Sequence, residues 1–209
     1  MTTTPTVAEE AARYLAVADP LLAPVIQAVG PCTIRPHQDY YAALVRSILG
    51  QQLSLKAAAS IESRFVAHFG GQFPSPKALL SASSVELRAC GLSGAKTNYI
   101  RDVAQHVDDG RIEFDRFDQL DNGTIIRELT AIKGVGEWTA HMFLMFCMAR
   151  SDILAVGDLG IKNGVQRLYG LNRQPSAADV TEIALHNRWH PYETIACWYV
   201  WRSLELTDY

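Results

Sequence analysis

The sequence has few cysteines and no long hydrophobic run. Its four cysteines among 209 residues include no Cys-x-x-Cys pair, so zinc fingers and cysteine-ligated iron–sulfur clusters lack their ligand spacing. The longest uncharged apolar run, residues 138–149, is shorter than the about 20 residues that a membrane span needs. Glu9 and Glu10 interrupt the apolar residues after Met1, so no signal peptide is predicted. We therefore expect a cytoplasmic protein with no iron–sulfur cluster and no membrane partner.

Several other signatures are missing as well. No stretch alternates steadily between apolar and polar residues, which argues against a sheet of any size. There is no P-loop and no Gly-x-Gly-x-x-Gly motif, so the common nucleotide-binding folds are not indicated. His186 and His190 are four residues apart, but Pro191 ends any helix they could share and no carboxylate ligand is obvious. No metal site is predicted.

What the sequence does contain is a series of helix start and stop signals. Asp39 precedes apolar residues spaced as one helix face, Gly50 ends that segment, and Ser54 caps the next. The same signals predict an all-α fold with tight connections, whose further helices open at Pro76, Ser84, Ser93, residue 124, residue 137, Asp158, Ser176 and Pro191. The segments 124–132 and 137–149 are predicted as two helices.

Charge is distributed unevenly along the chain. The formal net charge is only −3, but residues 46–101 contain seven basic and two acidic side chains. A basic face on an acidic protein is compatible with DNA binding. The same feature is common on ordinary helical proteins, so charge alone decides nothing.

The most informative segment is the connection between the helices predicted at 124–132 and 137–149. It reads Lys133-Gly134-Val135-Gly136, and both glycines permit the positive φ of a tight reversal. Its backbone N–H groups stand at the start of a helix, where the dipole favours an anion such as phosphate. A plain helix–helix turn is the simpler interpretation, but the apolar pair Ile132 and Val135 favours a helix–hairpin–helix motif, which grips DNA backbone.

Asp158 stands at a predicted helix start eighteen residues beyond Ala140. By itself it indicates only a helix N-cap. Together with the hairpin, it resembles the helix–hairpin–helix DNA glycosylase superfamily, and more narrowly the 3-methyladenine DNA glycosylase II family. The blocks that carry the resemblance are Leu44–Ser54, Gly91–Lys96, residues 129–140, the Asp158 segment and Arg188–Tyr192.

The resemblance implies two helical domains flanking a cleft for DNA and the active site. It implies a central domain over 38–150 that contains the hairpin, and a second domain built from 1–37 and 151–209. The implied function is that of a monofunctional glycosylase, which flips alkylated bases such as 3-methyladenine out of duplex DNA and excises them in base excision repair. Strand-cleaving relatives have a lysine where this chain has Trp138, which argues against the alternative of an oxidised-base glycosylase/lyase.

The resemblance also implies roles for individual residues. Asp158 is the catalytic carboxylate, which stabilises an oxocarbenium-like sugar or orients water. The implied base pocket has Trp138, Met142, Leu159 and Trp201, of which Met142 and Leu159 replace aromatic residues of some relatives. The implied DNA contacts are Gln51, Gln52, Ser54, Lys133, Gly134, Val135 and Gly136, with Gln52 where some relatives use a leucine to fill the gap left by the flipped base.

We expect a monomer whose partner is double-stranded DNA with damaged bases, nucleoid-associated if the source is bacterial. No cofactor is expected to be required, although hairpin carbonyls of related proteins often hold a monovalent cation, Na⁺ or K⁺. A non-catalytic protein that binds DNA structure through the hairpin is the alternative, and the retained Asp158 speaks against it.

Overall fold

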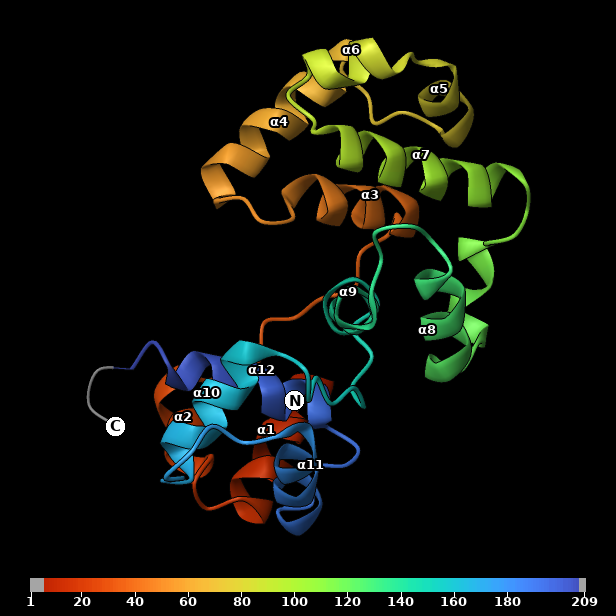
Figure 1. Cartoon of the computed structure of the whole chain (residues 1–209). Helices are drawn as coiled ribbons and strands as arrows, with labels where there is room; N and C mark the ends of the chain where they lie inside the picture. Colours follow the sequence, from red (N-terminus) through yellow and green to blue (C-terminus); the bar gives the residue numbers. More distant parts are fainter. Residues whose placement is uncertain (1–5, 207–209) are drawn as a thin grey trace, which may run out of the picture. The chain divides into compact units, whose positions relative to one another are not determined.

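The computed structural model describes residues 6–206, and these form helices and connections with no strand (Figure 1). The predicted all-α class is confirmed. The chain divides into two compact units, one made of Met1–Pro36 and Leu144–Tyr209, the other of His37–Phe143. The predicted ranges 1–37 and 151–209 include residues 1–5 and 207–209, which lie outside the described part.

The unit His37–Phe143 is organised around one long helix, α7 (Gly94–Asp108), which packs against α3, α5 and α6 (Figure 1). Its apolar face buries Ile100, Val103 and Ala104. The other elements of this unit are α3 (Tyr40–Gly50), α4 (Leu55–His68), α5 (Pro76–Ser81), α6 (Ser84–Ala89), the 3-10 turn η1 (Phe114–Gln119), α8 (Asn122–Thr130) and α9 (Glu137–Met142).

Side-chain caps fix where these helices begin. The Asp39 carboxylate accepts the Ala42 N–H at 2.8 Å, and Ser54 and Ser93 accept the N–H groups of Ala57 and Lys96. These three caps are those that the sequence predicts. For α6 the cap is Ser83 rather than Ser84, because Ser83 forms a capping box with Glu86.

In the other unit, α12 (Glu193–Ser203) is the central helix and packs against α10, α1 and α2. The surrounding helices are α1 (Val7–Ala18), α2 (Ala23–Val29), α10 (Leu159–Leu168) and α11 (Ala177–His186).

A buried carboxylate joins segments of this unit that are far apart in sequence. Asp19 accepts hydrogen bonds from Trp189 Nε1 at 2.8 Å, from the Tyr169 hydroxyl, and from the backbone N–H groups of Leu21 and Leu22.

The prediction of a single helix over 137–149 is wrong. The α-helix α9 ends at Met142, and Phe143–Cys147 form a π-helical turn, η2. Ala149 then has a positive φ of 54°, and the Arg150 N–H closes the segment on the Leu144 carbonyl. Periodicity does not reveal this change, because Phe143, Leu144 and Met145 are buried as they would be in a continuous helix.

Candidate functional site

The hairpin between α8 and α9 is fixed to its own unit by two apolar side chains. Ile132 and Val135 are only 2% and 4% exposed, and the Val135 N–H donates to the Ile132 carbonyl at 3.1 Å. The apolar pair that favours the helix–hairpin–helix motif in the sequence is therefore buried in the structure. The exposed residues of the turn are Lys133, Gly134 and Gly136.

The two hairpin glycines have different requirements. Gly134 has φ +83°, and a Cβ there would lie 2.3–2.6 Å from the ring atoms of Tyr99 on α7. Gly136 has φ −90° and ψ 173°, and a Cβ there would meet nothing within 4 Å. The expectation that both glycines serve a tight reversal is therefore wrong for Gly136, whose extended backbone is open to any residue.

Lys133 is tied to α7 through Asp102. Its backbone N–H donates to Asp102 Oδ2 at 2.8 Å, and its Nζ lies 3.7 Å from Asp102 Oδ1. The lysine side chain is 77% exposed. Its charge is therefore available at the surface but faces a carboxylate, which weakens the field that it offers to a phosphate.

The loop between α3 and α4 touches the hairpin. Gln51 Nε2 donates to the Gly134 carbonyl at 3.2 Å. Lys96 Nζ in turn donates to the carbonyls of Leu49 and Gln51, each at 2.8 Å, and burial lowers the pKa of this ammonium group. Two predicted DNA-contacting segments, far apart in sequence, thus lie together.

The remaining residues of this loop have distinct surroundings. Gln52 is exposed and has a positive φ of 56°, which is uncommon for a residue with a Cβ. The Ser54 hydroxyl caps α4 by accepting the Ala57 N–H at 3.3 Å. A structural role thus accounts for Ser54 whether or not it contacts DNA.

One face of α9 presents Trp138, His141 and Met142, which are three and four residues apart. Trp138 is 51% exposed, whereas His141 and Met142 are half-buried. Burial lowers the pKa of His141, against the opposing effect of Glu137. Burial therefore favours the neutral form of the imidazole on this face of α9.

Asp158 caps α10 in the other unit. Its Oδ1 accepts two hydrogen bonds of 2.8 Å, one from the Ile161 N–H and one from Trp201 Nε1 on α12. The Trp201 ring also lies 5.6 Å from that of Phe146, tilted by 32°. The structure thus places the predicted catalytic residue and one predicted pocket residue in contact. Leu159, the next residue, is 61% exposed.

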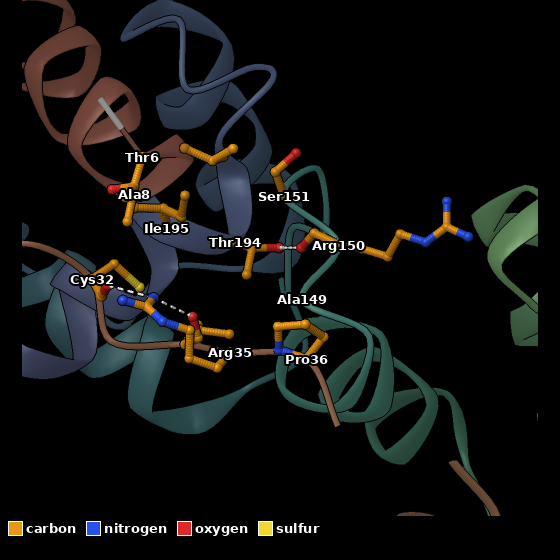
Figure 2. A pocket seen from close by; sticks show the side chains of 12 residues that line it. Thr6, Ala8, Cys32, Arg35, Pro36, Ala149, Arg150, Ser151, Thr194 and Ile195 are labelled. Carbon is orange, nitrogen blue, oxygen red and sulfur yellow. Dashed lines mark hydrogen bonds between the residues drawn. The ribbon is translucent and has the colours of Figure 1, made fainter. Parts of the chain in front are cut away.

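A separate cavity of about 360 Å³ lies in the same unit, lined by residues of α1, the 32–36 segment, the 149–151 loop and α12 (Figure 2). Asp158 and Trp201 do not line it. Arg35 folds back to donate to the Ile34 carbonyl, Thr194 donates to the Arg150 carbonyl, and the Arg150 side chain points away (Figure 2). The cavity therefore does not contribute to the Asp158 cluster.

Four residues that support the site were not predicted from the sequence. Lys96, Tyr99 and Asp102 are three residues apart on α7 and hold the α3–α4 loop and the hairpin. The spacing of these polar residues on one helix face was the available signal. Gly160 lies against Trp201 and Asp158, and no local pattern distinguishes it from any other helix glycine.

The helical fold, the hairpin and the capped aspartate define a family. Residues 45–191 match the family described as HhH-GPD superfamily base excision DNA repair protein, and the chain belongs to it. Among curated proteins, it is 36% identical over 177 residues to DNA-3-methyladenine glycosylase 1 of Schizosaccharomyces pombe, covering 82% of this chain and 75% of the relative. The resemblance predicted from the sequence is confirmed.

Solved structures agree with this assignment. A DNA-3-methyladenine glycosidase from Bacillus halodurans superimposes with a TM-score of 0.82 and 38% identity, covering 92% of this chain and 88% of that one. The S. pombe 3-methyladenine DNA glycosylase Mag1, solved in complex with abasic DNA, gives a TM-score of 0.82 and 32% identity, covering 96% and 98% of the two chains. Within residues 6–206, no helix is both long and apolar enough to cross a membrane.

Proposed function

We propose that this chain is a monofunctional DNA glycosylase that excises alkylated bases such as 3-methyladenine from duplex DNA in base excision repair. The observation that carries the proposal is the Asp158 carboxylate, held at the start of α10 by two N–H donors. Family membership and the names of the relatives support the same reaction.

The chemistry requires a fixed negative charge. A purine nucleoside alkylated at a ring nitrogen, as in 3-methyladenine, has a cationic base, so the C1′–N bond breaks with its electron pair leaving on the base, which becomes neutral. The sugar then carries an oxocarbenium-like positive charge, which the Asp158 carboxylate stabilises. Water adds to C1′ and loses a proton, leaving an abasic site. Because Asp158 is already oriented by its hydrogen bonds, little reorganisation accompanies the reaction.

The proposed base pocket uses Trp138, Met142, Leu159 and Trp201. An electron-rich indole attracts a cationic base by about 0.5–2 kcal/mol. Burial lowers the pKa of His141 on the same face as Trp138 and so disfavours a competing positive charge there. Flipping costs less for a damaged base than for an intact one, which adds selectivity. With Met142 and Leu159 in place of aromatic residues, we propose a wider pocket.

Trp138 stands at the position of the lyase lysine of strand-cleaving relatives. Its side chain has no amine that could form a Schiff base, so we propose that the protein does not cleave the strand by that route. We expect the product strand to break only after treatment with alkali or an abasic endonuclease. Borohydride should trap no covalent complex with DNA. A trapped adduct would contradict the monofunctional assignment.

We propose that a monomer of this protein contacts the sugar–phosphate backbone of duplex DNA through the hairpin and the Gln51–Ser54 loop.

The hairpin also offers backbone carbonyls, which are suitable ligands for Na⁺ or K⁺. The Ile132 carbonyl accepts one N–H and retains a second lone pair. If a cation binds there, replacing NaCl and KCl with tetramethylammonium chloride at equal ionic strength should weaken duplex binding. Equal affinity in all three salts would contradict the cation site.

The test of catalysis is Asp158→Asn. The amide oxygen can still accept from Ile161 and Trp201, so the substitution removes the charge and keeps the cap. Excision of 3-methyladenine from a duplex should fall by at least about 10²-fold, with little change in affinity. Asp152→Asn, an exposed aspartate six residues earlier in the chain, is the matched control and should keep full activity.

Wild-type excision by Asp158→Asn would overturn the catalytic role. If the wild-type protein binds duplex DNA but releases no base from a panel of single-lesion duplexes, the chain is instead a non-catalytic DNA-binding protein.

A further inference from the structure

Helices α10 and α12 approach each other closely at two glycines. A Cβ on Gly160 would lie 2.7 Å from Trp201 Nε1, 2.8 Å from Trp201 Cδ1 and 3.0 Å from Asp158 Oδ1. One turn later, a Cβ on Gly164 would lie 2.5 Å from Val200 Cγ1 and 2.7 Å from the Val200 carbonyl oxygen. Neither glycine has a positive φ, so space and not backbone conformation requires them.

The close approach has a direct consequence for Asp158. It brings the Trp201 indole N–H within 2.8 Å of Oδ1, the same oxygen that accepts from Ile161. A carboxylate held only by its cap could still turn about that bond. Two donors from different elements, one backbone and one side chain, fix its direction.

We propose that Gly160 is a positioning residue for catalysis, because its missing side chain lets the Trp201 N–H orient the Asp158 carboxylate. Trp201 then has a second task besides lining the base pocket. The inference rests on the proposed function, since it concerns how the same carboxylate is held. Gly160 acts on the reaction only through Trp201.

Three variants and a control test this linkage. Gly160→Ala displaces the indole, and Trp201→Phe keeps an aromatic ring but removes the N–H. Each should lower the single-turnover excision rate by about 10- to 100-fold, as expected when a reacting group shifts by about 1 Å. Affinity for undamaged duplex should stay within about 2-fold. In the double variant, Gly160→Ala should add less than about 3-fold to the loss from Trp201→Phe, because the hydrogen bond is already gone.

Gly157→Ala is the matched control. It adds the same methyl group one residue before Asp158, where a Cβ would meet nothing within 4 Å. Its excision rate should match the wild type.

The indole N–H signal of Trp201 gives a readout independent of activity. In a ¹H–¹⁵N spectrum, it is the indole cross-peak that Trp201→Phe removes. It should shift in Gly160→Ala and in Asp158→Asn, and stay in place in Gly157→Ala. An unmoved peak in Gly160→Ala, or rate losses that multiply in the double variant, would overturn the inference.

The two proposals fail in different ways. If Asp158→Asn keeps full excision, the catalytic role is wrong whatever the spectrum shows. If Asp158→Asn is inactive but Trp201→Phe excises at the wild-type rate, the carboxylate acts without this donor, and only the positioning role is lost. The Trp201→Phe arm also decides the matter if Gly160→Ala does not fold.

Discussion

Gly134 and Gly136 lie in the same four-residue turn but have different structural requirements. Gly134 is required by the fold, since its φ is positive and the Tyr99 ring occupies the space of a side chain. Gly136 is required by nothing within the protein. The proposed function supplies a reason for glycine from outside the chain, the close approach of a phosphate to the start of α9.

This contrast yields a paired prediction. Gly134→Ala should lower the free energy of unfolding by about 1–3 kcal/mol, from backbone strain and displacement of Tyr99. Gly136→Ala should leave it unchanged or raise it by up to about 1 kcal/mol, because alanine fits that backbone and restricts the unfolded chain. Urea unfolding followed by circular dichroism measures both.

DNA binding should depend on Gly136, although the stability of the fold does not. Gly136→Asp should weaken binding to damaged and undamaged duplexes alike, by obstruction and by repulsion of phosphate. Fluorescence anisotropy with both duplexes at several salt concentrations measures this effect. A folded Gly136→Asp protein with wild-type affinity would show that the hairpin is only a turn.

At the scale of elements, α7 does more than support the core. Its Lys96, Tyr99 and Asp102 hold the α3–α4 loop and the hairpin from one helix face. Lys96 makes the most specific of these contacts, since this half-buried residue donates from its ammonium group to two carbonyls at the end of α3. The segment 46–101 is therefore less basic toward a ligand than its composition indicates.

We predict that Lys96→Met destabilises the protein by about 1–3 kcal/mol, because the carbonyls of Leu49 and Gln51 lose a charged donor. Duplex affinity should also fall, since Gln51 is no longer held beside the hairpin. Lys77→Met, at an exposed position on α5, makes the same chemical change and should alter stability by less than about 0.5 kcal/mol. Equal effects of the two variants in urea unfolding would mean that the Lys96 contacts contribute nothing.

Local signals account for what could be predicted from the sequence. Caps such as Asp39, Ser54 and Ser93 lie within three residues of the N–H groups that they accept, so the sequence alone gives the helix starts. The role proposed for Asp158 comes from the resemblance carried by the family blocks. The contacts of Gln51 with Gly134 and of Trp201 with Asp158 join segments that are distant in sequence, and no local pattern encodes them. The π turn at Phe143–Cys147 was missed because burial looks the same in either helix type.

At the scale of the whole molecule, one compact unit is assembled from the two ends of the chain. Asp19 lies at the join, since its carboxylate accepts from Trp189 and Tyr169 as well as from the backbone. A fully buried carboxylate is stable only because these donors satisfy it.

Asp19→Asn should therefore lower the free energy of unfolding by about 2–4 kcal/mol. One neutral amide oxygen replaces the two oxygens of a charged carboxylate, and the amide NH₂ group faces other donors. Urea unfolding followed by tryptophan fluorescence reports the loss, because Trp189 is a direct partner. Asp152→Asn serves again as the exposed control, with a change under about 0.5 kcal/mol. A stable Asp19→Asn protein would show that packing alone holds the ends together.

During synthesis, Asp19 is made long before its two side-chain partners. Asp19 emerges from the ribosome 150 residues before Tyr169 and 170 residues before Trp189. By then the contiguous unit His37–Phe143 is complete, whereas α1 and α2 still expose Leu15, Leu22 and Val25, which are buried in the finished structure. Until then the nascent chain carries a carboxylate without its two side-chain donors and an uncovered apolar surface, and the unit that holds Asp158 completes its fold only after the other unit has been synthesised.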